Sequence, residues 1–182
     1  QPVAERWQKL TGRYITEAYG LTESSPGVCA NPLGTPWNGA IGLPFPSTEV
    51  SIRNDDFREL PVWTGEDDVE RHTGEICVRG PQVMKGYWNK PEETAKVLQD
   101  GWLKTGDIGH LDADGYFTIT DRKKDLFKTS GGKYVAPPAI EAKFKAVCPY
   151  ASQFMVFGEE RNYCIALITL DPDAMGRLIL SG

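Results

Sequence analysis

The sequence predicts an α+β protein in which short β elements dominate. Its 182 residues include 19 glycines and 13 prolines, more than the roughly 7% and 5% of average usage, so turns are frequent. Residues 1–121 contain mostly short strand-like segments between loops, whereas residues 122–182 contain two strands, a helix and two further strands. We therefore expect a mostly β region followed by a smaller α+β region.

The charge distribution changes at the same place in the chain. Residues 1–121 carry 11 basic and 19 acidic side chains, and residues 122–182 carry 9 basic and 6 acidic ones. The net charge is therefore −8 in the first region and +3 in the second. Such a shift indicates a domain boundary, so we expect domains at 1–121 and 122–182. The total charge of −5 argues against a nucleic-acid partner.

Helix, strand and loop signals follow one another at the start of the chain. Residues 3–13 read as the end of a helix with one apolar face, and "GRYITEAYG" leads into a short strand and a turn. Residues 26–46 hold five prolines and four glycines and read as one long loop. The highly charged residues 55–73 read as a solvated loop.

Two strands and one helix are predicted in the middle of the chain. Val50 and Ile52 lie on one face of "STEVSIRN", which indicates a half-buried strand, and "GEICVRG" is a second strand between glycines. The segment "NKPEETAKVLQDG" begins like a helix, with Asn89 as the cap and Pro91 in the first turn. We expect Gly101 to end that helix.

The last third of the chain has clear element signals. "DADGYFTIT" reads as a turn and a strand, and "DLFKTSGGKYVAP" as a hairpin turned by glycines. "PPAIEAKFKAV" reads as a helix that opens on prolines, and "SQFMVFG" and "NYCIALITL" as two strands. The apolar runs are strand-sized, well short of the ~18 residues of a membrane span.

The cysteines and histidines do not form a metal-binding pattern. The four cysteines stand at positions 29, 77, 148 and 164 without a CxxC pair, and the two histidines are 38 positions apart. This spacing argues against a structural zinc site and favours a reducing compartment with buried thiols.

Four glycine-bearing motifs carry the functional prediction: "YGLTE", "GEICVRG", "TGD" and "DRKKDLFKTSGGKYVAPPAIE". In this order and spacing they resemble the adenylate-forming superfamily of acyl-CoA synthetases, luciferases and peptide-synthetase adenylation domains. The longer stretches "YGLTESSPGV", "GPQVMKGYWNKPEET", "GWLKTGDIG" and "KTSGGKYVAPPAIE" are most similar to bacterial long-chain fatty-acid–CoA ligases. The resemblance implies that residues 1–121 are the C-terminal part of the large adenylation domain, with its distorted-barrel subdomain. Residues 122–182 would be the hinge and most of the small lid domain.

The resemblance implies an ATP-dependent, AMP-forming reaction with fatty acid, ATP and CoA as substrates and Mg²⁺ as the metal. A fatty-acid carboxylate attacks the α-phosphorus of ATP to give an acyl-adenylate, and CoA then takes the acyl group as a thioester. Both reactants of the first step are anionic, so a metal and cations must neutralise their repulsion. By resemblance, Glu23 binds the magnesium and Thr22 hydrogen-bonds the phosphate or the acyl-adenylate. Tyr19 would stack on the adenine, and Gly20 would allow close backbone approach.

Three residues are expected around the nucleoside. The resemblance implies that Asp107 accepts hydrogen bonds from the ribose hydroxyls, because a carboxylate suits a vicinal diol. Arg122 would be a second ribose or phosphate contact through its fixed charge. Ile119 would pack near the adenine or ribose, and the reading as an ordinary strand core residue stays equally open.

The basic segment after residue 121 is assigned to the lid. By resemblance Lys124 occupies the hinge, and Lys128 belongs to the loop that enters the site in the second half-reaction. The glycine turn is one residue longer than in luciferase, which weakens the transfer of a catalytic role to Lys128. The residues expected near the pantetheine of CoA are Ser130, Gly131 and Gly132. Glu75 is expected to be structural.

Two family features do not occur in the sequence: a phosphate loop of the "TSGTTGxPKG" type and the lysine expected near the C-terminus. We therefore expect a piece of a longer enzyme that is inactive in adenylation by itself. The alternatives are a fatty-acyl–AMP ligase or peptide-synthetase adenylation domain, and a non-catalytic module derived from this fold. Retention of Thr22, Glu23, Asp107 and Arg122 argues against the module. The expected location is the cytoplasm, with room for peripheral contact at the inner face of the membrane, while acyl chain length and oligomeric state stay open.

Overall fold

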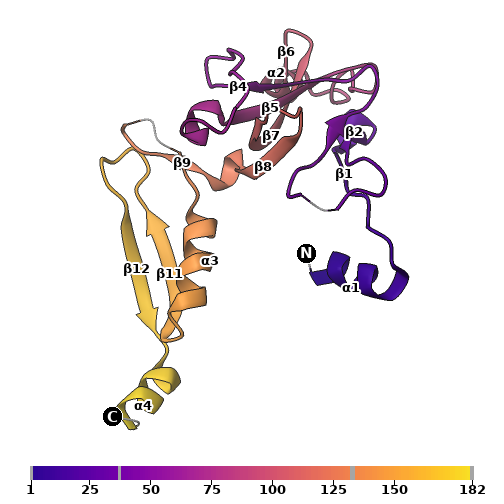
Figure 1. Cartoon of the computed structure of the whole chain (residues 1–182). Coiled ribbons are helices and arrows are strands. Elements are labelled where there is room, and N and C mark those ends of the chain that lie inside the picture. The colour runs from indigo at the N-terminus through magenta and orange to yellow at the C-terminus, as the bar shows by residue number, and fades with distance from the viewer. Residues whose placement is uncertain (1, 37, 132–133, 181–182) are drawn as a thin grey trace. The chain divides into compact units, whose positions relative to one another are not determined.

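A computed structural model describes residues 2–36, 38–131 and 134–180 and has the mixed α+β architecture that the sequence predicts. The chain forms two compact units, Gln1–Thr120 (unit 1) and Asp121–Gly182 (unit 2). Figure 1 shows that β strands dominate unit 1, whereas unit 2 combines helices with a long hairpin.

A five-stranded sheet is the centre of unit 1. Its strands run in the order β4-β5-β7-β6, and β8 also pairs with β7. The strands are β4 (Glu49–Arg53), β5 (Gly74–Arg79), β6 (Leu98–Gln99), β7 (Trp102–Leu111) and β8 (Phe117–Arg122). The strands predicted in "STEVSIRN", "GEICVRG" and "DADGYFTIT" are confirmed. The longest strand, β7, was not predicted, because its apolar residues do not alternate and Gly106 interrupts it.

A smaller sheet is formed by β1 (Ala18–Gly20), β2 (Gly27–Ala30) and β3 (Leu43–Pro44), in that order. The prediction of a single long loop over residues 26–46 is therefore wrong at β2 and β3. The error has a physical reason: prolines and glycines flank a four-residue strand whose central pair, Val28 and Cys29, is fully buried. Burial of that pair outweighs the turn signals around it.

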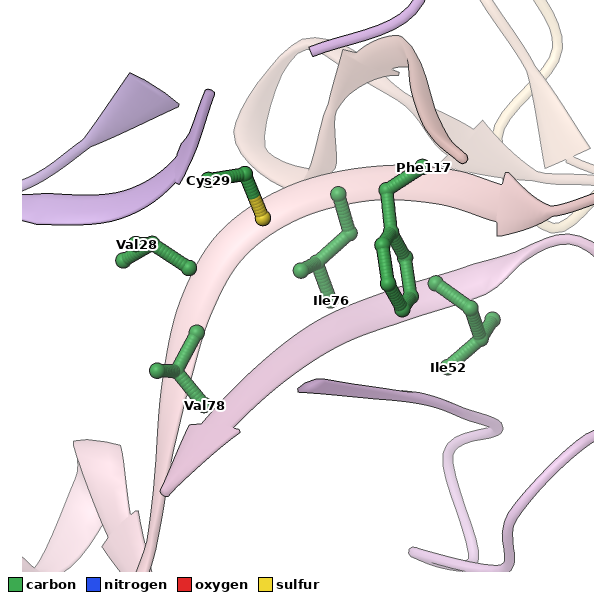
Figure 2. Packing of buried hydrophobic residues seen from close by; sticks show 6 residues of the cluster. All are labelled: Val28, Cys29, Ile52, Ile76, Val78 and Phe117. Atoms are coloured by element: carbon green, nitrogen blue, oxygen red, sulfur yellow. The ribbon is translucent and has the colours of Figure 1, made fainter. Parts of the chain in front are cut away.

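The hydrophobic core of unit 1 lies between strands of both sheets (Figure 2). The buried cluster consists of Val28, Cys29, Ile52, Ile76, Val78 and Phe117. Burying each larger aliphatic or aromatic side chain contributes about 1.5–3 kcal/mol relative to exposure. Tyr19 and Ile119 are partly buried and pack against this cluster, so the core fixes the position of β1 beside the central sheet.

The helices of unit 1 are α1 (Pro2–Thr11) and α2 (Pro91–Val97), with the 3₁₀ turns η1 (Thr22–Ser24) and η2 (Val69–His72). Helix α2 differs from its prediction at both ends. Its cap is Lys90, because Asn89 has a φ of 52°. Gly101 does not end the helix; with Asp100 it forms the two-residue turn between β6 and β7. Both have positive φ, 50° and 79°, the backbone that an Asp-Gly hairpin turn requires.

The charged loop at residues 55–73 is mostly exposed, as predicted, but it is tied to the sheet. The backbone N–H of Trp63 donates to the carbonyl of Leu111 at 2.8 Å. His72 is buried, and its Nδ1 lies 2.9 Å from the Pro61 carbonyl oxygen while its Nε2 lies 2.9 Å from Asp67 Oδ1. The prediction of a simply solvated segment is therefore wrong around His72.

Unit 2 begins with the 3₁₀ turn η3 (Lys123–Asp125) and contains the predicted hairpins and helix. Helix α3 packs against β11, with the Phe144 and Phe154 rings stacked 4.0 Å apart, and Figure 1 shows α3 running beside the long hairpin. The remaining elements are β9 (Phe127–Lys128), β10 (Tyr134–Val135), α3 (Pro137–Val147), β11 (Ala151–Phe157), β12 (Ile165–Leu170) and α4 (Pro172–Leu180).

Candidate functional site

A short turn after β1 carries the predicted metal-binding acid. Glu23 lies in η1, and the fully buried Ser24 beside it holds the turn. The Leu21 N–H donates to Ser24 Oγ at 2.9 Å, and the Ser24 hydroxyl has the carbonyls of Leu21 and Pro26 within 2.9 and 2.8 Å. The hydroxyl can accept from the Leu21 N–H and donate its one hydrogen to a carbonyl, so it provides hydrogen-bond partners for the backbone of this turn. Thr22, in the same turn, is exposed.

Gly20 is required by crowding inside this turn. A Cβ at position 20 would lie 1.5 Å from the Pro26 carbonyl oxygen, a distance that no side chain can adopt. From the sequence, Gly20 is expected to let the backbone approach the nucleotide. The structure supplies a separate reason for glycine that involves no ligand.

Tyr19 connects this segment to the second predicted acid. Its hydroxyl donates to Asp107 Oδ2 at 2.6 Å, across 88 positions of sequence. Burial, followed by this hydrogen bond, raises the pKa of Tyr19 far above its usual value. The phenol therefore stays protonated and remains a donor at neutral pH.

The "TGD" motif lies within β7 at an irregularity of the strand, where the register of its pairing with β5 shifts. Gly106 has a φ of 77°, and its N–H donates to Glu75 Oε1 at 3.1 Å. The Asp107 N–H donates to Thr105 Oγ1 at 3.1 Å, and that hydroxyl donates to the Ile76 carbonyl at 2.7 Å. The buried Glu75 thus supports this irregularity from β5, in line with its expected structural role. Together these bonds fix where the Asp107 carboxylate lies.

Glu23 is held from a different part of the chain. The Tyr87 hydroxyl donates to Glu23 Oε1 at 2.8 Å, and the Met84 N–H donates to the Glu23 carbonyl at 2.8 Å. The bond to Glu23 raises the pKa of Tyr87, so this phenol also remains a donor. Sequence reasoning did not single out Tyr87, although it lies inside the quoted stretch "GPQVMKGYWNKPEET". Nor did it single out Ser24 or Thr105.

The two predicted acids converge on one segment. Asp107 is hydrogen-bonded to Tyr19, and Glu23 follows Tyr19 by four residues. The structure therefore brings Tyr19, Glu23 and Asp107 into one neighbourhood of unit 1. Ile119 packs against the core cluster, which favours its alternative interpretation as a strand core residue.

The remaining predicted residues follow the boundary between the units. Arg122 ends β8 and Lys124 lies in η3, and both are exposed. In unit 2, Lys128 Nζ lies 4.5 Å from the centre of the Tyr134 ring, a cation–π contact. The Ser130 N–H donates to the Arg161 carbonyl at 3.0 Å. Gly131 lies in the turn between β9 and β10.

Gly132, also expected near CoA, lies outside the described residues.

The residues present suit magnesium better than a metal held wholly by protein. Within residues 2–36, 38–131 and 134–180, no group of three or more His, Cys, Asp or Glu side chains could hold an ion. Mg²⁺ is commonly bound through one or two carboxylates together with substrate phosphates and water. A single oriented carboxylate at Glu23 fits that mode.

Among the residues that the structure describes, no helix is long and apolar enough to cross a membrane.

Comparison with known proteins was consistent across sequence and structure. Residues 1–88 match the family model described as AMP-binding enzyme. The long-chain-fatty-acid–CoA ligase of Salmonella typhimurium is 52% identical over 76% of this chain and 23% of the relative. The ligase of the same name from Bacillus subtilis is 49% identical over 76% of this chain and 24% of the relative. The chain thus spans about a quarter of the length of these curated relatives.

Two solved structures extend the similarity over nearly the whole chain. Unliganded O-succinylbenzoate CoA synthetase from Bacillus subtilis has a TM-score of 0.69 and 26% identity, over 99% of this chain and 38% of that one. The same enzyme with ATP and magnesium ion has a TM-score of 0.66 and 30% identity, over 93% and 34%. The motifs, the fold and these matches agree, and the chain belongs to the adenylate-forming superfamily of AMP-binding enzymes.

Proposed function

We propose that this chain is part of an ATP-dependent, AMP-forming long-chain fatty-acid–CoA ligase. The observation that carries the proposal is the pair of tyrosine–carboxylate hydrogen bonds, Tyr19 to Asp107 and Tyr87 to Glu23, on one segment of unit 1. Half-buried carboxylates held by phenol donors are oriented groups, as a binding site requires. The names of the curated relatives support the fatty acid and CoA as substrates.

In the proposed first step, a fatty-acid carboxylate oxygen attacks the α-phosphorus of ATP. An acyl–O–P bond forms and pyrophosphate leaves with the electron pair of the broken P–O bond. Glu23 would hold the Mg²⁺ that accompanies ATP, and the metal when bound neutralises phosphate charge. Thr22 would donate to a phosphate oxygen. Asp107 would accept from the ribose hydroxyls while Tyr19, fixed by its bond to Asp107, presents its ring to the adenine.

In the proposed second step, the CoA sulfur attacks the acyl carbonyl and AMP leaves. Arg122, Lys124 and Lys128 belong to the segment assigned to the hinge and the lid. Lys124 would absorb the backbone rotation, and the turn at Ser130–Gly131, with Gly132, would lie near the pantetheine. Both the roles and the acceptor CoA are parts of the proposal, supported by the family and by the relatives' names.

The proposal is tested on the complete protein that contains this chain, with substitutions at both acids. We expect Glu23→Gln to lower fatty-acid-dependent ATP–pyrophosphate exchange about 10- to 100-fold and to raise the Mg²⁺ requirement. Asp107→Asn is expected to raise the KM for ATP without changing the Mg²⁺ requirement. Glu66→Gln, in the exposed loop, is the matched control. Wild-type exchange and Mg²⁺ dependence in both Glu23→Gln and Asp107→Asn would contradict the assignment.

A further inference from the structure

Tyr87 and Glu23 are joined at two levels. The phenol hydroxyl donates to Glu23 Oε1 at 2.8 Å, and the Met84 N–H, three residues before Tyr87, donates to the Glu23 carbonyl at 2.8 Å. The same short segment therefore holds both the side chain and the backbone of Glu23. The bond between the Tyr87 and Glu23 side chains links positions 64 residues apart in sequence, so this contact exists only in the folded chain.

Tyr87 is itself held by the start of α2. Its N–H donates to Thr94 Oγ1 at 2.9 Å, and its carbonyl accepts from the Lys90 N–H at 3.1 Å. Before it, Gly86 has a φ of 148°, and a Cβ there would lie 2.8 Å from Thr94 Cγ2. The backbone at Tyr87 is thus fixed on both sides, so the phenol reaches Glu23 from a rigid support.

A carboxylate needs such support to bind magnesium well. Mg²⁺ requires nearly ideal octahedral geometry and tolerates little displacement of its ligands. A free glutamate side chain rotates among several rotamers and must lose that freedom on binding. A hydrogen bond to one oxygen removes the freedom beforehand and leaves the second oxygen to face the ion.

We infer that Tyr87 is the positioning residue of the magnesium site: its hydroxyl holds Glu23 Oε1 so that Oε2 is presented to the metal. This inference rests on the proposed function, because it requires Glu23 to be the metal ligand. Tyr87 lies outside the "YGLTE" motif. It would affect the magnesium site through Glu23 and would not contact the substrate. Partners of this kind are worth about 10- to 100-fold in metal affinity.

The experiment is a Mg²⁺ titration of the complete protein carrying Tyr87→Phe, which keeps the ring and removes the hydroxyl. We expect the Mg²⁺ concentration for half-maximal ATP–pyrophosphate exchange to rise about tenfold, with the maximal rate recovered at saturating Mg²⁺. Binding of Mn²⁺ to the ATP-bound protein, followed by electron paramagnetic resonance, is expected to weaken in parallel. Tyr14→Phe, which removes a phenol hydroxyl from an exposed side chain of unit 1, is the control.

A double-mutant cycle separates positioning from general damage. If Tyr87 acts through Glu23, Tyr87→Phe has no further effect in the Glu23→Gln background. An equal rise in the half-maximal Mg²⁺ concentration in both backgrounds overturns the inference and leaves the proposed function standing. A Mg²⁺ titration of Tyr87→Phe that matches the wild type, while that of Glu23→Gln is shifted, does the same. If Glu23→Gln itself titrates like the wild type, the metal role of Glu23 and the inference fail together.

Discussion

Gly20 shows how a single missing side chain determines the geometry of the site. In Gly20→Ala the new Cβ would meet the Pro26 carbonyl oxygen at 1.5 Å, so the turn that carries Glu23 must move. We expect a loss of at least about 1–3 kcal/mol in the free energy of unfolding, measured by urea denaturation with circular dichroism.

The control for Gly20→Ala is Gly176→Ala. Apart from its chain neighbours and the backbone of its own helix, no atom of the described residues lies within 4 Å of a Cβ at Gly176, which lies inside α4. Alanine there is expected to stabilise the chain by up to about 1 kcal/mol, because it is the better helix former. Equal effects of the two substitutions would contradict the crowding at Gly20.

His72 gives unit 1 a dependence on pH. Both of its ring nitrogens face acceptors, the Pro61 carbonyl and the Asp67 carboxylate, and only the protonated ring donates to both. The bond to Asp67, opposed by burial and by the Arg71 charge, raises the pKa of His72. Its stabilising effect is therefore complete below the unfolded value of about 6.5 and is lost as the pH rises through the folded pKa. We expect the stability difference between wild type and His72→Gln to be larger at pH 6 than at pH 8.5.

His110 provides a contrast of opposite sign. Burial lowers its pKa, against the nearby charge of Asp112, and its ring packs edge-on against Trp63 with centres 5.3 Å apart. Because the pKa of His110 is lowered in the folded state, its contribution to the free energy of unfolding is complete above about pH 6.5. This contribution is lost as the pH falls through the folded pKa. We expect the difference between wild type and His110→Gln to be larger at pH 8 than at pH 5.5, measured by urea denaturation. The same pH trend for both histidines would contradict these contacts.

Residues within motifs could be predicted from the sequence, but their partners could not. Tyr19, Glu23 and Asp107 were identified because each lies in a short recognisable string. Tyr87 and Thr105 act through hydrogen bonds to groups 64 and 29 positions away, and no local pattern records such a distance. Ser24 hydrogen-bonds the backbone of its own turn, but a serine in a loop indicates only that a turn is favoured and does not predict this role.

Among the elements, the central sheet depends on a contact between three strands. The Trp102 ring of β7 has the Arg53 guanidinium of β4 and the Arg79 guanidinium of β5 each 4.5 Å from its centre. Trp102 is only 8% exposed. We expect Trp102→Ala to cost about 3–5 kcal/mol of unfolding free energy.

Trp102→Phe tests the cationic part of this contact, since it keeps an aromatic ring with a weaker attraction for cations. We expect its cost to be clearly smaller than that of alanine, measured by the same denaturation experiment. Equal destabilisation by phenylalanine and alanine would contradict a contribution of the aromatic ring at this position.

Regular elements were predicted where their pattern is self-sufficient. Strand β4 follows the alternation of Val50 and Ile52, and helix α3 begins at the prolines that the sequence displays. Strand β2 was not predicted, because its own composition does not indicate a strand. Its burial against the five-stranded sheet stabilises it as one. The end of α2 was misplaced because an Asp-Gly turn and a helix stop share the same glycine signal.

For the whole molecule, the division into two compact units predicts that unfolding is not a single transition. All five tryptophans of the sequence precede residue 121, so their fluorescence reports on unit 1 alone, whereas far-UV circular dichroism reports on both. We expect the two signals to give different urea midpoints, because separate cores unfold separately. Coincident transitions by both methods would contradict independent units.

In unit 2, the end of β9 and the residues after it are tied to a turn before β12: the Glu160 N–H donates to the Lys128 carbonyl at 2.8 Å, and the Ser130 hydroxyl donates to Asn162. These bonds couple movement of residues 128–130 to movement of that turn. Cys164 follows closely and is exposed, whereas Cys29 is buried with its pKa raised to about 12. A thiol-reactive dye on Cys164 would thus report on movement of the segment that carries Lys128.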